Sequence, residues 1–200
     1  MLRRCLALVL FVVALASTPQ AVAGSFEDGV DAAQRGNYAT ALRLWRQLAE
    51  RGDADAQFNL GRMYDRGEGV PQDYARAVSW YRKAADQGDA DAQLHLGVMY
   101  ALGHGVAQNY VQAVSWYRKA TAQENAAAQV LLGLMYASGQ GVPQDYVQAH
   151  MWVNLAASRA TDPELRGSSV KARDALAAKM TREQIARAQQ LALEWKPKGK

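Results

Sequence analysis

Histidines are the first residues in this sequence that could do acid/base chemistry or bind a metal ion. There are three, His95, His104 and His150. They fall at three different positions of an internal repeat described below, so the pattern gives them no common pocket. We therefore expect structural histidines, and neither a catalytic group nor a metal site.

Closely spaced carboxylates are the second candidate, since paired acids can serve as general acid and base or hold a cation. Asp53 lies two residues before Asp55, and Asp89 lies two residues before Asp91. Each pair stands at a predicted helix start, where the partial positive charge of the helix end stabilises an acidic side chain by ~0.3 to 1 kcal/mol. The spacing therefore favours helix capping over catalysis.

Two further patterns resemble nucleotide-binding elements. Paired glycines such as Gly67 and Gly69 suggest a phosphate loop, but no strand precedes them and no lysine follows at the required position. Aromatic residues beside Arg82 and Arg118 suggest a base-stacking surface. These aromatic residues recur with the repeat, so we predict that they pack between helices. We expect no cofactor and no nucleic-acid partner.

The elements that position these residues follow a repeat with a period of 36 residues. Leu60-Gly61, for example, recurs as Leu96-Gly97 and as Leu132-Gly133. A fixed period of 20 to 50 residues is typical of solenoids and related arrays. The positions that we predict to form the repeated framework are Gly61, Tyr64, Gly69 and Trp80, then Gly97, Tyr100, Gly105 and Trp116, then Gly133, Tyr136, Gly141 and Trp152.

Each unit is predicted to form two antiparallel helices. Short polar residues that can cap the amides of a first turn open the first helix at Asp53, Asp89 and Asn125, and the second helix at Asp73, Asn109 and Asp145. The glycine pairs end the first helix, because the turn back calls for positive φ angles. One pair of helices cannot bury its own apolar face, so we predict an all-α solenoid of stacked pairs.

The sequence Gly69-Val70-Pro71-Gln72-Asp73-Tyr74, together with Ala56-Gln57, Leu60-Gly61 and Trp80-Tyr81, resembles the Sel-one-like repeat. Three consecutive units agree over residues 53 to about 158, and the shorter leading pair is similar to a tetratricopeptide repeat. The resemblance implies a right-handed superhelix that acts as an adaptor in complexes, envelope signalling or host contact. One branch of the family is cysteine-rich and linked to β-lactam hydrolysis. This chain lacks those cysteines, so the resemblance does not carry that activity over.

The first 23 residues have the pattern of a secretory signal peptide. Arg3 and Arg4 precede an apolar run over Cys5–Ala16, and small residues lead to a cleavage point after Ala23. The remaining chain would be periplasmic or secreted, with no membrane span. It would also lack any thiol, because Cys5 is the only cysteine. Subtracting the two arginines from 23 basic residues leaves 21 against 19 acidic ones, and this net charge of +2 gives no indication of a nucleic-acid partner.

The predicted organisation is a chain of short units. It runs from the signal peptide (1–23) through a leading helix pair (24–52) and three repeats (53–88, 89–124 and 125–160) to capping helices (161–195) and a basic tail (196–200). The capping helices are expected to start at Pro163 and after Thr181, and to cover the last repeat.

The concave face of the solenoid is the predicted binding surface, because repeat proteins bind ligands there. On each first helix, the residues expected to face away from the partner helix are Asp55, Phe58 and Arg62, then Asp91, Leu94 and Val98, then Ala127, Val130 and Leu134. This stripe becomes more apolar toward the C-terminus and suits a peptide or protein partner. We predict a non-catalytic envelope scaffold. The alternatives are an envelope hydrolase acting on cell-wall material or β-lactams, and a secreted regulator or host-directed factor.

Overall fold

The computed structural model describes residues 25–197, and these form ten helices and no strand. The predicted all-α solenoid is confirmed. The predicted signal peptide and the last three residues of the predicted tail lie outside the described residues. Within residues 25–197, no helix is both long enough and apolar enough to cross a membrane.

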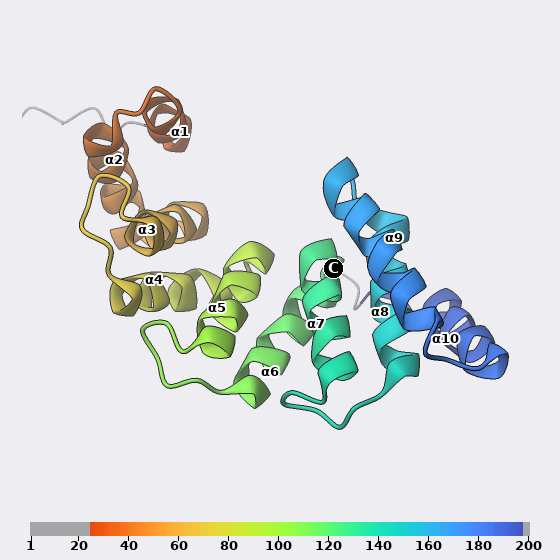
Figure 1. Ribbon diagram of the computed structural model, residues 1–200. Helices are drawn as coiled ribbons and strands as arrows, with labels where there is room; N and C mark the ends of the chain where they lie inside the picture. Colours follow the sequence, from red (N-terminus) through yellow and green to blue (C-terminus); the bar gives the residue numbers. More distant parts are fainter. Residues whose placement is uncertain (1–24, 198–200) are drawn as a thin grey trace, which may run out of the picture.

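The helices follow one another in pairs, which are α1 (Phe26–Gln34) with α2 (Tyr38–Glu50), α3 (Ala54–Arg66) with α4 (Tyr74–Asp86), α5 (Ala90–Leu102) with α6 (Tyr110–Thr121), and α7 (Ala126–Ser138) with α8 (Tyr146–Arg159), followed by α9 (Pro163–Ala177) and α10 (Arg182–Glu194). From α1 to α9 each helix packs on the helix before it in the chain, whereas α10 packs on α8. The pairs form an arc (Figure 1), in which α3, α5 and α7 line the inner side and α4 and α6 the outer side.

The predicted caps form at every repeat. Asp53, Asp89 and Asn125 each accept a hydrogen bond from the backbone amide three residues later, and Asp73 and Asn109 do the same on the second helices. The first helices end at glycines with φ of 71° to 72°. In this left-handed region a residue with a Cβ is strained, so glycine at the end of the helix determines where the chain turns back.

The framework glycines allow the helices of one pair to approach closely. A Cβ added at Gly61 would lie 2.5 Å from the Tyr81 ring, and one at Gly97 would lie 2.5 Å from the Tyr117 ring. The loop glycines act between neighbouring pairs, since a Cβ at Gly105 would overlap the backbone of Tyr74, at the start of the previous pair's second helix. Both classes of glycine therefore permit contacts that a side chain would block.

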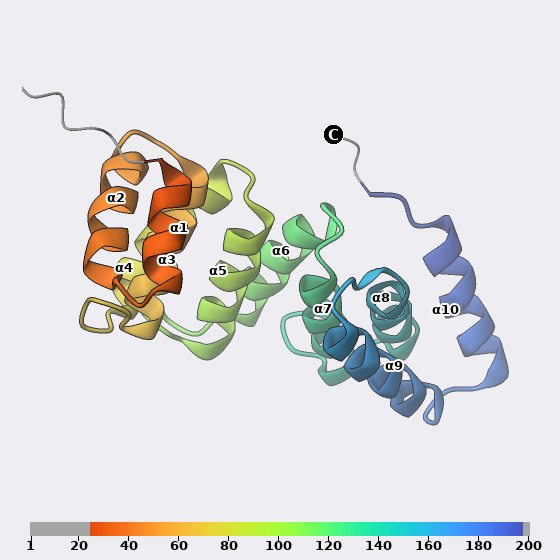
Figure 2. The same ribbon diagram turned by 90° about the horizontal axis from the view of Figure 1, so that it is seen from above.

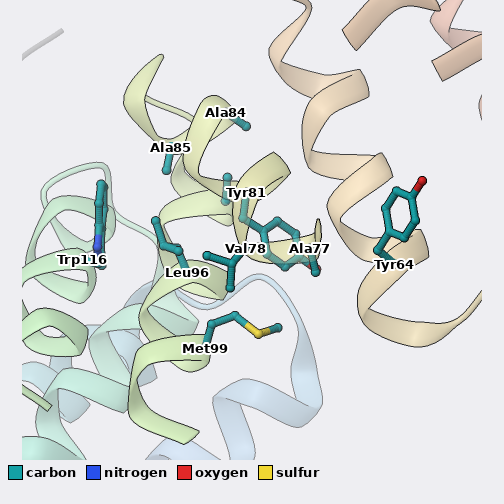
Figure 3. Packing of buried hydrophobic residues seen from close by; sticks show 10 residues of the cluster. Tyr64, Ala77, Val78, Tyr81, Ala84, Ala85, Leu96, Met99 and Trp116 are labelled. Atoms are coloured by element: carbon teal, nitrogen blue, oxygen red, sulfur yellow. The ribbon is translucent and has the colours of Figure 1, made fainter. Parts of the chain in front are cut away.

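The core continues from one pair to the next. Tyr81 is fully buried and lies near Leu96 and Met99 of the following pair (Figure 3). Because α4 contributes one face to its partner α3 and another to α5, no unit has a core of its own. This sharing is the reason why stacked units are stable where a single pair is not.

Helices α9 and α10 pack on α8 and cover the last repeat, as the sequence predicts. Asp162 caps α9 with proline at its first position, and Thr181 forms a capping box with Gln184 at the start of α10. Met151 and Leu155 of α8 pack against small residues of α10. The apolar face that a fifth pair would otherwise bury is thereby closed.

Candidate partner-binding groove

The inner face of the arc holds an apolar groove between α5 and α7, with a volume of about 480 Å³. Leu94, Val98 and Leu102 form its α5 wall, and Ala127, Val130 and Leu131 form its α7 wall. The end of α3 and the start of α4 close one side of the groove through Asp65, Arg66 and Tyr74. We call this set of residues the inner groove.

Four of the nine residues that the sequence places on the concave face line the inner groove: Leu94, Val98, Ala127 and Val130. Arg62 lies in the neighbouring cleft between α1 and α3. Asp55 and Asp91 are exposed near the starts of α3 and α5. Leu134 is exposed further along α7.

The side chain of Phe58 contacts the partner helix α4, whereas the sequence predicted that it faces away from that helix. Its ring centroid lies 5.8 Å from that of Tyr81 on α4 and 5.5 Å from that of His95 on α5. Gly61, one turn away, lets the Tyr81 ring come close against α3, so the ring also reaches Phe58. Phe58 therefore packs against α4 and α5, and it is only partly accessible.

The inner face changes in character along the arc. The cleft between α1 and α3 is lined by several polar side chains, Gln34, Asn59, Arg62 and Glu68 among them. The inner groove is mainly aliphatic, and Arg66 belongs to both. The apolar end lies toward the C-terminus because α5 and α7 carry leucine or valine at the positions where α3 carries Phe58 and Arg62.

The expectation that the histidines share no pocket is wrong for two of them. His95 and His104 both line the inner groove. His104 stacks on Tyr74 with ring centroids 4.4 Å apart, and His95 stacks on Tyr81 at 5.2 Å. Their positions in the repeat differ, but α5 ends at Leu102 in the groove wall, and the loop that follows brings His104 beside it.

Polar groups around the groove interact with neighbouring protein groups through a hydrogen bond and through ring stacking. The Tyr81 hydroxyl donates a hydrogen bond to Asp65 over 3.2 Å, and burial together with this carboxylate raises the pKa of Tyr81 well above its usual range. Burial lowers the pKa of His95, which favours the neutral ring at neutral pH. Among residues 25–197, no group of three or more potential ligand side chains is arranged to hold a metal ion. The arrangement suits non-covalent recognition of apolar side chains.

Sequence reasoning missed Leu102, His104, Tyr74 and Leu131. Leu102 follows Val98 by one helical turn, so extending the stripe of Leu94 and Val98 would have found it. Tyr74 and His104 join the groove from a helix start and a loop. Their position depends on how one pair stacks on the next, and the repeat period alone does not give that.

Comparison with known proteins places these features in context. A family model described as Sel1 repeat matches residues 22–53, 54–89, 90–125 and 126–160. It thus includes the leading pair, which the sequence likened to a tetratricopeptide repeat, as a fourth unit. No curated protein matches the chain.

Among the solved structures similar to this chain are two bacterial proteins. A Sel1 repeat protein from Oxalobacter formigenes has 28% sequence identity and a TM-score of 0.66, with 85% of this chain and 75% of that chain covered. A protective antigen present in uropathogenic Escherichia coli strains, displaying an SLR fold, has 31% identity and a TM-score of 0.51. That match covers 84% of this chain and 44% of the antigen.

Proposed function

Because this chain belongs to the Sel1 repeat family, we propose that it is a binding scaffold whose inner groove takes an apolar segment of a protein partner. The Sel1 repeat fold generally mediates protein–protein interactions, and its scaffold families are typically non-catalytic. The finer proposal concerns where the partner binds and what kind of segment it offers.

The observation that carries the proposal is the exposure of aliphatic side chains on the inner face. Leu102 is 57% exposed and Leu134 is 44% exposed, on two neighbouring helices that line the same side of the arc. The other aliphatic residues that form the walls of the inner groove are half-buried. An exposed apolar patch of this kind, with polar groups at its rim, is typical of an interaction surface.

The shape of the groove favours a helical or extended segment. The walls are two helices, so a partner helix could place apolar residues one turn apart between them, as in helix-in-groove recognition. At the α3 end, Asp65, Arg66 and His104 offer polar groups that could fix its direction. Burying two or three aliphatic side chains there would contribute ~1.5 to 3 kcal/mol each.

The proposed setting is the cell envelope or the medium. This part of the proposal rests on the charged start, apolar run and small residues over positions 3–23.

Site-specific photo-crosslinking tests the binding surface. Benzoylphenylalanine is introduced at Leu102, in the inner groove, or at Val111, which is 64% exposed at the start of the outer helix α6. Both positions carry an exposed aliphatic side chain, so they differ mainly in their place on the arc. After irradiation of living cells that produce the protein, we expect discrete protein adducts from position 102 and none of the same mass from position 111.

A groove variant then links the adducts to recognition. Val98→Asp places a charge in the middle of the α5 wall and should abolish the adducts from position 102, because a carboxylate cannot be desolvated there without a partner. The circular dichroism melting curve of the variant shows whether the fold is kept. Equal adducts from both positions, or adducts that survive Val98→Asp in a folded protein, would place the partner elsewhere.

A further inference from the structure

A ladder of glutamine side chains ties neighbouring pairs together, and it is broken at the last pair. Gln57 donates to the Ala49 carbonyl over 3.0 Å and accepts from Gln87 over 2.8 Å. One period later, Gln93 donates to the Ala85 carbonyl over 3.1 Å and accepts from Gln123 over 3.0 Å. At the first two junctions, the buried side-chain amide at this position of the repeat therefore uses both its nitrogen and its oxygen in hydrogen bonds.

In the third junction the corresponding amide is left without partners. Gln129 is 0% exposed, and neither its Nε2 nor its Oε1 makes a hydrogen bond. Arg159 stands where the earlier units have Gln87 and Gln123. Its guanidinium pairs with Glu124 and lies 4.6 Å from the centroid of the Trp195 ring. The third junction therefore lacks the amide hydrogen bonds that join the first two.

The backbone departs from the pattern at the same junction. Glu124 has φ of 64°, where Gly52 and Gly88 stand in the earlier units, both with φ of 98°. A left-handed conformation at a residue with a side chain is strained, and such strain is concentrated at functional sites. The Trp152 Nε1, on α8 in the same region, is also buried without a partner.

A basic, aromatic cleft of about 490 Å³ opens beside this junction. Arg118, Lys119 and Thr121 of α6 line one part of it and Trp152 of α8 another. Trp195 and Lys196 come from the segment after α10, which bends away from the axis of that helix (Figure 2). We call it the tryptophan cleft. Its lining includes three cations and no carboxylate.

Two of the three cations of the tryptophan cleft are held in place. Arg118 donates to the Tyr136 hydroxyl over 2.9 Å, and the Lys119 ammonium lies 3.7 Å from the centroid of the Trp116 ring. The two indoles meet edge to face, with centroids 5.8 Å apart and planes at 73°. Positioned cations around an apolar aromatic wall form a site for an anion that carries an apolar group.

We propose that the tryptophan cleft is a second binding site, independent of the inner groove, and that it takes an acidic peptide segment in which a carboxylate neighbours an aromatic or aliphatic side chain. The carboxylate lies between Arg118, Lys119 and Lys196, and the apolar side chain lies against Trp195. The cleft is large enough for one or two side chains, which fits a short linear segment.

The geometry favours a peptide over nucleic acid or a lipid surface. Single-stranded nucleic acid needs a track of aromatic faces on which successive bases stack, and the perpendicular indoles of the cleft offer no such track. A membrane surface is flat, whereas these cations line a recess between α6 and the segment after α10. A peptide side chain can enter a recess of this size.

Calorimetric titration with the acetylated and amidated peptide Glu-Phe-Glu-Glu-Phe-Glu tests the proposal. We expect binding that weakens as salt is raised and that is absent for the lysine counterpart Lys-Phe-Lys-Lys-Phe-Lys. The double variant Arg118→Gln with Lys119→Gln should weaken binding about tenfold or more, because charge-assisted hydrogen bonds are lost. Trp195→Leu should also weaken it, with melting curves showing that the fold is kept.

The repeat supplies a matched control. Arg82 and Lys83 occupy the same positions one period earlier, where Arg82 donates to the Tyr100 hydroxyl and the Lys83 ammonium lies 3.9 Å from the Trp80 centroid. They lie outside the tryptophan cleft. Arg82→Gln with Lys83→Gln should therefore leave the affinity for the peptide unchanged.

Several outcomes would overturn the proposal. They are no binding of the acidic peptide at low salt, equal loss of affinity in the two double variants, and equal binding of the lysine peptide. Tighter binding to phosphatidylglycerol vesicles or to a thymidine oligomer, with the same dependence on Arg118 and Lys119, would assign the cleft to a different ligand class.

Discussion

His150 departs from the residue type of the repeat at a buried position, and this departure lowers the stability of the fold. It stands on α8 at the position where the earlier units have Val78 and Val114, both buried. Its side chain is 2% exposed, and its Nδ1 has no hydrogen-bond partner. Burial and the Arg173 guanidinium lower the pKa of His150, and Asp174 opposes them.

The lowered pKa of His150 predicts an acid-dependent loss of stability. Below the ordinary histidine pKa of 6.5, the unfolded chain binds a proton that folded His150 binds only at lower pH. The free energy of unfolding therefore falls as pH drops below 6.5, and it levels off once the folded state is protonated too. His150→Val should raise the unfolding free energy at neutral pH by about 1 kcal/mol, because an unpaired buried polar group is removed.

Urea denaturation at neutral pH and at about pH 5 checks this prediction. The fall in stability between the two conditions should be smaller in His150→Val than in the natural chain. Some fall should remain, because burial also lowers the pKa of His95. An unchanged fall would show that His150 contributes nothing to the pH dependence.

At the residue scale, sequence reasoning was strongest for groups that act locally. A cap such as Asp53 depends on its own helix turn, and a C-terminal glycine such as Gly67 depends on its own φ angle, so both follow from short-range spacing. The environments of His104 and Phe58 depend on side chains from other helices. Their type and repeat position did not contain that information, which is why the expectations for both were wrong.

At the scale of elements, the turn between α6 and α7 differs from the equivalent turns before α3 and α5. Those turns use Gly52 and Gly88 in a left-handed conformation, whereas this one uses Glu124 with φ of 64°. The strain is partly offset by the ion pair that Glu124 makes with Arg159, the last residue of α8. Half-exposed ion pairs contribute little, usually below ~1 kcal/mol.

Two substitutions of Glu124 separate the strain from the ion pair. Glu124→Ala and Glu124→Gly both remove the carboxylate, but only glycine adopts this φ without penalty. We expect Glu124→Gly to be more stable than Glu124→Ala by about 1 kcal/mol, despite the greater flexibility of its unfolded chain. Chemical denaturation of both variants measures the difference. Equal stabilities would mean that the turn relaxes to a different conformation when the side chain is lost.

The order and type of the helices were predictable because each pair carries its own start and stop signals. Asp73, Asn109 and Thr181 begin helices in the structure as their sequence contexts predict. The walls of the inner groove were partly predictable, since Leu94 and Val98 follow from helical spacing. The tryptophan cleft was not, because Trp195 reaches α6 only through the way α10 packs on α8.

At the scale of the whole molecule, the shared core makes stability a chain of neighbour interactions. In the arc, each pair contacts the pair before it and the pair after it, and α1 with α2 forms one end (Figure 1). In such arrays the stability is close to a sum of unit terms and junction terms, so an end unit can open without its distant neighbours. The same damage should therefore have different consequences at the end and in the middle.

Two equivalent glycine substitutions, one in the end pair and one in a central pair, test whether the same damage has different consequences in the two places. A Cβ at Gly29 would overlap the Trp45 indole inside the first pair, and a Cβ at Gly97 would lie 2.5 Å from the Tyr117 ring in a central pair. Each overpacked contact should cost about 1 to 3 kcal/mol. Gly167→Ala is the control, because no atom lies within 4 Å of the added Cβ on the exposed face of α9.

Hydrogen exchange followed by mass spectrometry resolves where each variant opens. Gly29→Ala should speed exchange in α1 and α2 and leave α7 to α10 as protected as before, because the end pair opens alone. Gly97→Ala should speed exchange on both sides of α5 and α6 and lower the melting temperature of the whole chain, since a central junction supports two neighbours. Gly167→Ala should leave exchange unchanged or slower. Uniform acceleration in Gly29→Ala would instead mean that the arc unfolds as one cooperative unit, with the junctions stronger than the pairs that they join.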